Sequence, residues 1–199
     1  MGIAFVSTES RARALVSEPG SRPPTDGLLL KRIAEGNQLA MRAFFTRHKL
    51  RVYRFVLRIL QDEALAEDIM SDVFLDVWRQ ADRFRGGCAA STWLLAIARN
   101  KAVAEKRRKR DVALDEDLAS TIVDPDGDPG ITLEKKDRKR VIRRCLATLS
   151  PEHREAIDLV YYHEKSITEV AHILNVPEGT VKSRMFEARK RLAPLVASG

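Results

Sequence analysis

The chain has 199 residues, of which 44% are hydrophobic, and it carries 35 Lys and Arg against 28 Asp and Glu. This length is typical of two small domains with apolar cores, and the net charge of +7 favours a polyanionic partner. The longest apolar run near the middle, "WLLAIA" at residues 93–98, is far shorter than the roughly 20 residues of a membrane-spanning helix, so we expect no membrane insertion.

Cysteine and histidine are sparse and lack the spacing of metal ligands. Cys88 and Cys145 lie far apart and belong to no CxxC pair, and the four histidines do not fit a zinc site. We therefore expect no disulfide framework, no metal and no cofactor, and a location in the reducing cytoplasm.

The first 110 residues divide into a leader and a helical unit. Residues 1–27 are predicted to be a flexible leader, because their apolar stretch is too short for a signal peptide and they end in "SEPGSRPPTDG". Residues 28–110 are predicted to form four helices, with breaks at "GN", "QDE" and "RGGCAAS". Asn37, Asp62 and Ser91 are the expected N-caps.

One face of the third predicted helix, within "AEDIMSDVFLDVW" (residues 66–78), is acidic. Asp68, Asp72 and Asp76 follow one another at a spacing of four, and Leu75 projects beside them. Like charges at this spacing disfavour an isolated helix by roughly a few tenths of a kcal/mol, so a basic protein partner is one explanation. A solvated acidic face is the other.

The fourth predicted helix, "TWLLAIARNKAVAEKRRKR", is apolar at its start and strongly basic at its end. Residues 99–110 contain seven Lys and Arg and one Glu, which is typical of a surface that holds a nucleic-acid backbone. Phe84 and Trp93 flank the preceding loop. An aromatic ring in this position either stacks on an unpaired base or packs into the core.

Residues 111–132 are predicted to be a flexible acidic linker. The stretch "DVALDEDLASTIVDPDGDPG" contains seven Asp and Glu and no Lys or Arg, and its Pro and Gly residues oppose regular structure. Helical periodicity resumes at about residue 133 and continues to 195, with Ser150 and Pro151 placed to begin a helix. Because no alternating β pattern occurs, we expect an all-α protein of two small helical domains.

The segment "SITEVAHILNVPEGTVKSRMFEARKRL" has the pattern of a helix-turn-helix. Ser166 and Glu169 fit a capping box at the start of a short helix. Residues 175–176 fit the turn, and Pro177 fits the first position of the next helix. The expected buried stripe of that helix comprises Val181, Met185, Ala188 and Leu192. An amphipathic helix packed in a bundle would share the stripe but would not require the capping box and the turn.

The opposite face of this second helix and its flanks carry the residues expected to meet DNA. They are Thr180, Lys182, Ser183, Arg184, Phe186, Glu187, Arg189 and Lys190. Cations on the flanks suit phosphates, whereas the centre of the face suits base edges. For Glu187 two explanations stay open: it accepts a hydrogen bond from a cytosine amino group, or it pairs with Arg184 or Arg191.

Together these motifs resemble the extracytoplasmic-function (ECF) subgroup of bacterial sigma factors of the sigma-70 type. "AEDIMSDVFLDVW" is similar to the polymerase-binding segment of that family, and "STWLLAIARNKAV" is similar to its segment for the downstream promoter element. "LSPEHREAIDLVYY" and the helix-turn-helix are similar to its C-terminal promoter-binding domain. The resemblance implies a region 2 domain at residues 28–110 and a region 4 domain at residues 133–195.

The resemblance implies a protein without catalysis that recruits RNA polymerase to promoters and assists strand opening. The residues implied to dock on the clamp helices of the polymerase β′ subunit are Asp68, Ser71, Asp72 and Leu75, where the family usually has Gln in place of Ser71. The residues implied for the minus 10 element are Arg85, Trp93, Arg99, Asn100 and Lys101. The eight residues given above for the helix-turn-helix are implied for the minus 35 element.

The resemblance also implies further partners. These are the β flap of the polymerase and a cognate anti-sigma factor. The acidic linker fits a basic polymerase channel that otherwise holds RNA.

A LuxR-type activator is the chief alternative, since its output domain has a similar "TVK" helix-turn-helix. That class requires an α/β receiver or ligand-binding domain upstream, whereas the first half of this chain has helical periodicity. A nucleic-acid enzyme requires carboxylates clustered at a metal site or a nucleophile with its base, and the acidic ridge lies outward on a helix. Association with core polymerase separates these three classes.

Overall fold

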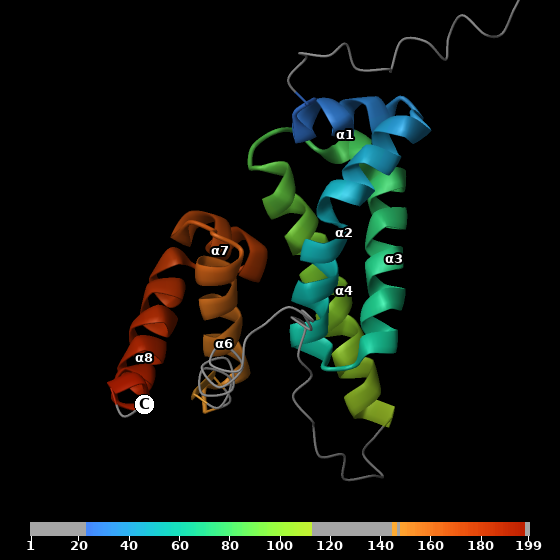
Figure 1. Ribbon diagram of the computed structural model, residues 1–199. Coiled ribbons are helices and arrows are strands. Elements are labelled where there is room, and N and C mark those ends of the chain that lie inside the picture. Colours follow the sequence, from blue (N-terminus) through green and yellow to red (C-terminus); the bar gives the residue numbers. More distant parts are fainter. Residues whose placement is uncertain (1–22, 113–144, 147, 198–199) are drawn as a thin grey trace, which may run out of the picture.

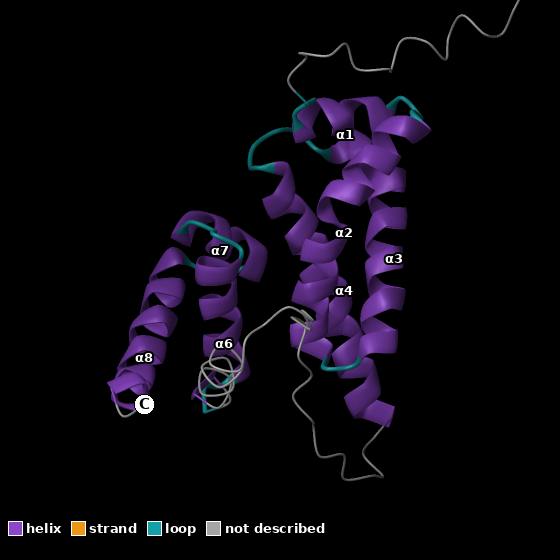
Figure 2. Cartoon of the chain, in the orientation of Figure 1, coloured by secondary structure: helices purple, strands orange, loops and turns teal. Residues whose placement is uncertain are grey.

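The structure, a computed structural model, describes residues 23–112, 145–146 and 148–197 (Figure 1). Every regular element within these residues is a helix, and none is a strand (Figure 2). The prediction of an all-α fold is therefore confirmed. Most of the predicted leader and acidic linker, residues 1–22 and 113–132, lies outside the described residues. No helix in the described ranges has the length and apolar character to cross a membrane.

Four long or medium helices form the N-terminal bundle, and a 3-10 turn follows the third of them. The elements are α1 (Asp26–Ala34), α2 (Gln38–Leu60), α3 (Glu63–Gln80), η3 (Ala81–Arg83) and α4 (Ala90–Val112). Asn37 accepts a hydrogen bond from the Ala40 N–H at 2.9 Å, and Asp62 accepts one from the Leu65 N–H at 3.1 Å. These two predicted N-caps are confirmed, because each side chain satisfies an otherwise unpaired donor of the first helical turn.

The start of α4 differs from the prediction. The helix begins at Ala90, and the carbonyl oxygen of Ala89 accepts hydrogen bonds from the N–H groups of Thr92 at 2.9 Å and Trp93 at 3.1 Å. Ser91 therefore lies within the first turn, and its prediction as N-cap is wrong. The Ser91 hydroxyl instead accepts a hydrogen bond from Lys165 Nζ at 2.7 Å.

Large apolar side chains fill the core of the bundle. Phe44, Phe55 and Leu94 are at most 1% exposed, and the rings of Phe44 and Phe74 meet edge to face with centroids 6.5 Å apart. Burial of each such side chain stabilises the fold by about 2 kcal/mol. The core thereby fixes which faces of α3 and α4 remain available to solvent.

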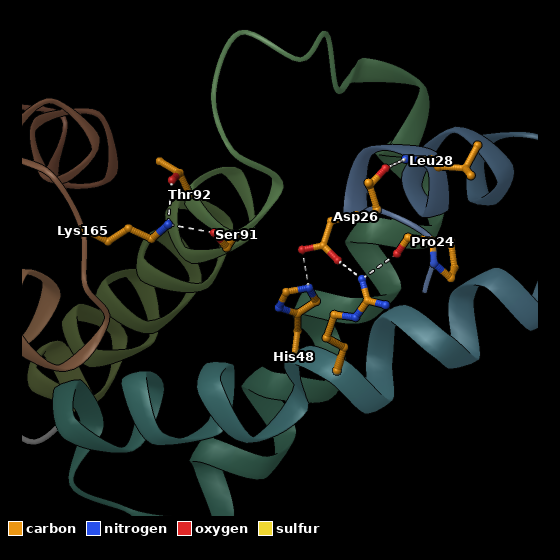
Figure 3. Close-up of polar contacts among 9 residues, drawn as sticks. Pro24, Asp26, Leu28, His48, Ser91, Thr92 and Lys165 are labelled. Carbon is orange, nitrogen blue, oxygen red and sulfur yellow. Dashed lines mark hydrogen bonds and ion pairs between the residues drawn. The ribbon is translucent and has the colours of Figure 1, made fainter. Parts of the chain in front are cut away.

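A charged cluster at Asp26 fastens α1 to α2. Its carboxylate accepts a hydrogen bond from Arg47 and lies 3.0 Å from Nε2 of His48 (Figure 3). Burial lowers the pKa of His48, although the charge of Asp26 acts in the opposite direction. The neutral imidazole can donate to Asp26 through Nε2–H, so the contact persists without a charge on His48.

Four further elements lie in the described residues of the C-terminal unit. They are α6 (Pro151–Ile157), a π-helical turn η5 (Asp158–Tyr162), α7 (Ile167–Leu174) and α8 (Glu178–Ala197). Ser150 accepts a hydrogen bond from the His153 N–H at 3.4 Å, and Pro151 occupies the first position of α6, as predicted. α7 and α8 form the predicted helix-turn-helix, with Asn175 in a left-handed conformation at φ 52° between them.

The packing of α7 and α8 confirms the predicted caps and stripe. The Glu169 N–H donates to Ser166 Oγ at 3.2 Å and the Ser166 N–H donates to Glu169 Oε2 at 3.0 Å, so the capping box is present. Along α8, the residues Val181, Met185 and Ala188 are at most 3% exposed, and Leu192 is partly buried. α8 begins at Glu178, so the prediction that Pro177 is its first residue is wrong. Pro177 lies directly before the helix, and its carbonyl oxygen accepts hydrogen bonds from the N–H groups of Thr180 at 3.0 Å and Val181 at 3.3 Å.

The N-terminal bundle and the C-terminal unit contact each other directly. α4 packs against α7, and buried side chains from both parts join in one apolar cluster. Phe55 of α2 meets the buried ring of His163 at 5.3 Å between centroids and 85° between planes. The face of the bundle that α4 presents is therefore partly covered by the C-terminal unit.

Candidate nucleic-acid interface

The predicted acidic ridge lies along an exposed face of α3. Asp68 and Asp72 are exposed, and within the described residues neither forms an ion pair. Asp76 is different, because its carboxylate lies 3.0 Å from Lys101 Nζ of α4. Leu75 is 51% exposed beside the acids. The part of the ridge open to a partner thus combines two carboxylates with an exposed leucine.

Ser71 lies on the same exposed surface, but its hydroxyl is already engaged. It donates to the carbonyl oxygen of Glu67 at 3.0 Å, one turn earlier in α3. A hydroxyl group that donates its hydrogen can still accept a hydrogen bond from a partner. Ser71 therefore offers an acceptor on the exposed surface that also carries Asp68 and Asp72.

The loop before α4 presents the first of the residues predicted for the minus 10 element. Arg85 is exposed, and the following Gly86 has φ 74°, a conformation that glycine adopts at little cost. Trp93 is partly buried and packs on Phe84, with ring centroids 5.6 Å apart. Trp93 was expected either to stack on an unpaired base or to pack into the core. Part of its ring packs into the core, and the rest stays accessible.

Of the three predicted minus 10 residues further along α4, both basic ones are paired within the protein. Arg99 forms a two-pronged contact with Glu155 of α6, with Nε–Oε1 at 2.7 Å and Nη2–Oε2 at 3.2 Å. Lys101 is held by Asp76, whereas Asn100 is exposed. The sequence predicted these residues as a group, but the structure leaves only Asn100 among the three without a charged protein partner in the described residues.

The outer face of α8 is accessible, and its most prominent side chain is apolar. Phe186 is 65% exposed, which is unusual for a phenylalanine without a partner. Ser183 donates to the carbonyl oxygen of Gly179 at 3.0 Å, and Lys190 is exposed. Thr180 and Arg184 are partly buried.

Some polar side chains of α8 are held within the C-terminal unit. Arg189 Nε donates to Tyr161 Oη at 3.0 Å, and Lys182 Nζ lies 3.9 Å from Glu178. Glu187 is partly exposed, and in the described residues no ion pair joins it to Arg184 or Arg191. The intramolecular pairing considered for Glu187 is therefore not present here, and its carboxylate stays available for another contact.

A cluster around Lys165 joins the two parts of the chain, and sequence reasoning missed it. Lys165 is 7% exposed, and its ammonium group donates to Ser91 Oγ at 2.7 Å and Thr92 Oγ1 at 3.0 Å (Figure 3). Glu169 lies 2.9 Å from the same nitrogen and accepts a further hydrogen bond from Thr92. The capping-box glutamate thus has a second role at the first turn of α4.

Glu169 has a strongly perturbed acidity. Burial favours its neutral form, but hydrogen bonds from Thr92, Lys165 and Ser166 outweigh burial and lower the pKa to about 2. A group whose pKa is depressed in the folded state adds stability above its unfolded pKa and loses it as the pH falls through the folded value. The contribution of Glu169 is therefore present at neutral pH and declines between about pH 4.5 and about pH 2.

The lowered pKa of Glu169 predicts how the stability of a variant without this charge depends on pH. We expect Glu169→Gln to lower the thermal midpoint at about pH 7, and the difference from the unsubstituted chain to narrow as the pH is lowered to about 3. Thermal unfolding followed by circular dichroism at both pH values measures the difference. An equal difference at the two pH values would mean that the charge of Glu169 does not stabilise the contact.

Comparisons with known proteins agree with the two-part architecture. Sigma-70 region 2 matches residues 44–112, and sigma-70 region 4 matches residues 139–192. The ECF RNA polymerase sigma factor SigK of Mycobacterium bovis (BCG) is 33% identical over 171 residues, which cover 82% of this chain and 89% of that protein. The chain belongs to the ECF subfamily of sigma-70 RNA polymerase sigma factors. A LuxR-type activator is not favoured, because a region 2 bundle stands where that class requires an α/β domain.

A further relative is similar in sequence, and two solved structures are similar in fold. SigK of Mycobacterium ulcerans is 32% identical over 185 residues, covering 87% of this chain and 95% of that protein. The sigma factor RpoE of Bartonella quintana, solved in complex with the anti-sigma factor NepR, has a TM-score of 0.66 and 26% identity over 78% of this chain and 96% of that chain. CnrH, solved with the cytosolic domain of CnrY, has a TM-score of 0.63 and 22% identity over 87% and 97%, which concerns the fold alone.

ECF sigma factors are initiation factors of transcription rather than enzymes. The two matched regions follow the order expected from the sequence motifs.

Proposed function

We propose that the exposed ridge of α3 is the surface by which this ECF sigma factor binds the β′ clamp helices of core RNA polymerase. Asp68 and Asp72 offer carboxylates that form no ion pair within the described residues, and Leu75, one turn after Asp72, offers exposed apolar area beside them. Charged groups at a protein interface steer association and fix the docking position, while a buried apolar side chain adds affinity. A second contact of the C-terminal unit with the β flap completes the proposed attachment.

The loop before α4 and the exposed part of α4 are proposed to bind the non-template strand at the minus 10 element. Arg85 in the loop and Asn100 on α4 are exposed, and Trp93 lies between them in the sequence, in the first turn of α4. A partly exposed indole can stack on a base that has left the duplex, which is worth roughly 1–3 kcal/mol. Arg99 and Lys101 supply positive charge once their internal partners are displaced.

α8 is proposed to enter the major groove at the minus 35 element. Lys182, Arg184 and Arg189 suit phosphates on the two flanks, and Thr180, Ser183 and Lys190 extend this polar surface. Phe186 and Glu187 are placed for the base edges, where an apolar ring touches a thymine methyl group and a carboxylate accepts from a cytosine amino group.

We further propose that an anti-sigma protein binds this chain in the cytoplasm. The similar RpoE chain was solved in complex with the anti-sigma factor NepR, at 26% identity and a TM-score of 0.66. The exposed ridge of α3 and the exposed α8 are both surfaces that such a protein can cover.

The observation that carries the proposal is the presence, in one chain, of two matched regions with exposed surfaces. The region 2 bundle has an acidic ridge on which Asp68 and Asp72 form no ion pair within the described residues, and the region 4 unit has an exposed second helix. We therefore expect the purified chain to bind promoter DNA specifically only together with core polymerase. Gel-shift assays on a forked promoter fragment, with and without core enzyme, measure this. Tight and specific binding to intact duplex by the chain alone would argue against the proposal.

A further inference from the structure

A tyrosine outside the helix-turn-helix holds the guanidinium group of Arg189. Tyr161 lies in η5, before α7, and is 59% exposed. Nε of Arg189 donates a hydrogen bond to Tyr161 Oη at 3.0 Å, and the guanidinium carbon lies 5.8 Å from the centroid of the tyrosine ring. Because arginine both stacks on aromatic rings and donates in a fixed geometry, the ring and the hydroxyl group together constrain this side chain.

The contact with Tyr161 leaves most donors of Arg189 available to a ligand. A guanidinium group has five N–H donors, and Tyr161 accepts from the single donor on Nε. Within the described residues, Arg189 has no other hydrogen bond and no ion pair. The two Nη atoms can donate in parallel to two oxygens of a phosphate. Held at Nε, the side chain therefore presents the edge that suits a phosphate.

Tyr161 is also an uncharged partner, unlike the partner of another cation on α8. Lys182 Nζ lies 3.9 Å from a carboxylate oxygen of Glu178, and this negative charge opposes the approach of a phosphate. The phenol hydroxyl accepts a hydrogen bond without cancelling the charge of the guanidinium group. Arg189 is thus fixed in place while its positive charge stays available.

Arg189 lies on the side of α8 that we propose for the minus 35 element. Phe186 is 65% exposed three positions earlier, and residues three apart are neighbours on a helix surface. Met185 and Ala188 are buried on the opposite side. Arg189 therefore lies beside the ring that is proposed to touch a base, where a cation suits the adjacent backbone.

We infer that Tyr161 is a positioning residue for DNA recognition, which orients Arg189 so that its Nη atoms meet a phosphate of the minus 35 element. This inference rests on the minus 35 role proposed above for Arg189. A long side chain loses conformational entropy when it binds, and one that is already held in the free protein loses less. The recognition surface thereby extends beyond α7 and α8 to η5.

The test combines protein variants with chemically modified DNA. Tyr161→Phe removes the hydroxyl acceptor and keeps the ring, and Arg189→Gln removes the guanidinium group. Each full-length chain is assembled with core polymerase and titrated with a fluorescent duplex that carries a minus 35 element selected by the unsubstituted chain. In a series of such duplexes, an uncharged methylphosphonate replaces one phosphate at a time, so that the contribution of each phosphate is measured separately.

We expect Tyr161→Phe to weaken binding of the unmodified duplex about fivefold, which is the usual effect of one lost hydrogen bond. Arg189→Gln should weaken binding about tenfold or more, because hydrogen bonds from a charged group are stronger. On the one duplex that lacks the phosphate contacted by Arg189, both substitutions should have little further effect. Neither variant then has a contact left to lose.

Lys182→Gln is the matched control, because Lys182 is another cation of α8 proposed to bind phosphate and lies beside Glu178 rather than Tyr161. Its effect should depend on a different phosphate and should add to the effect of Tyr161→Phe. The effects of Arg189→Gln and Tyr161→Phe should not add. Tyr161 and Arg189 are exposed, so neither substitution opens the core, and circular dichroism verifies the fold.

Two results would overturn the inference. One is an unchanged affinity of Tyr161→Phe for the unmodified duplex. The other is an equal loss for Tyr161→Phe on every duplex, since a tyrosine that only braces the fold would act in this way. If the effect of Arg189→Gln depends on one phosphate and that of Tyr161→Phe does not, the inference alone fails. If Arg189→Gln loses no affinity on any duplex, the proposed minus 35 role of Arg189 fails with it.

Discussion

Replacement of Asp72 by lysine is expected to lower the affinity of the chain for core RNA polymerase about tenfold or more. Asp72 is exposed and has no ion pair in the described residues, so the substitution breaks no internal contact. It turns a proposed attraction to basic clamp residues into repulsion, and close charge pairs at interfaces contribute about 1.5 kcal/mol or more. Every 1.4 kcal/mol corresponds to a tenfold change in affinity.

Pull-down of core polymerase at low and high salt measures this effect. The loss should be larger at low salt, because salt screens charges that lie near the surface. Asp82→Lys is the matched control, since Asp82 is also exposed but lies in η3, off the ridge. Equal retention of Asp72→Lys and the unsubstituted chain at both salt concentrations would reject the docking role of the ridge.

Substitution of Glu187 is expected to change which upstream sequence the chain prefers. Glu187 has no ion pair with a neighbouring arginine in the described part of α8, and it lies beside Phe186, which is 65% exposed. If its carboxylate accepts from a cytosine amino group, Glu187→Gln should lose roughly 1–3 kcal/mol of discrimination at one position of the minus 35 element. The required base at that position should no longer be C.

A library of minus 35 sequences, selected with core polymerase and Glu187→Gln or Glu187→Arg, measures this preference. Lys182→Gln is the control, because loss of a phosphate contact should weaken all sequences alike. If Glu187→Arg instead strengthens binding to every sequence equally, the carboxylate only repels phosphate and reads no base.

The local signals of the sequence were sufficient for most helix boundaries. Ser166 with Glu169 and Ser150 with Pro151 define helix starts through hydrogen bonds to residues three positions away, so a short window contains all the necessary information. The prediction of Ser91 as the N-cap of α4 was wrong, because the carbonyl oxygen of Ala89 is the first acceptor of this helix. A serine is also tolerated within the first helical turn, where Ser91 lies. The Ser91 hydroxyl instead accepts a hydrogen bond from Lys165, which is distant in sequence.

The contacts that govern the candidate site were not accessible from the sequence. Arg99 and Glu155 are separated by the predicted linker, and no periodicity relates the two residues. The spacing of Asp68, Asp72 and Asp76 revealed the ridge, but only the packing of α3 on α4 assigns Asp76 to Lys101. Helical spacing also suggested that Glu187 pairs with Arg184 or Arg191, but no such ion pair is present in the described residues.

Run-off transcription with purified core polymerase tests the central claim most directly. Templates carry either a promoter selected by this chain or the same promoter with its minus 10 and minus 35 elements scrambled. We predict a transcript that requires the chain, the core enzyme and the intact elements together. A chain that binds promoter duplex specifically on its own, and yields no transcript above core enzyme alone, would contradict the claim.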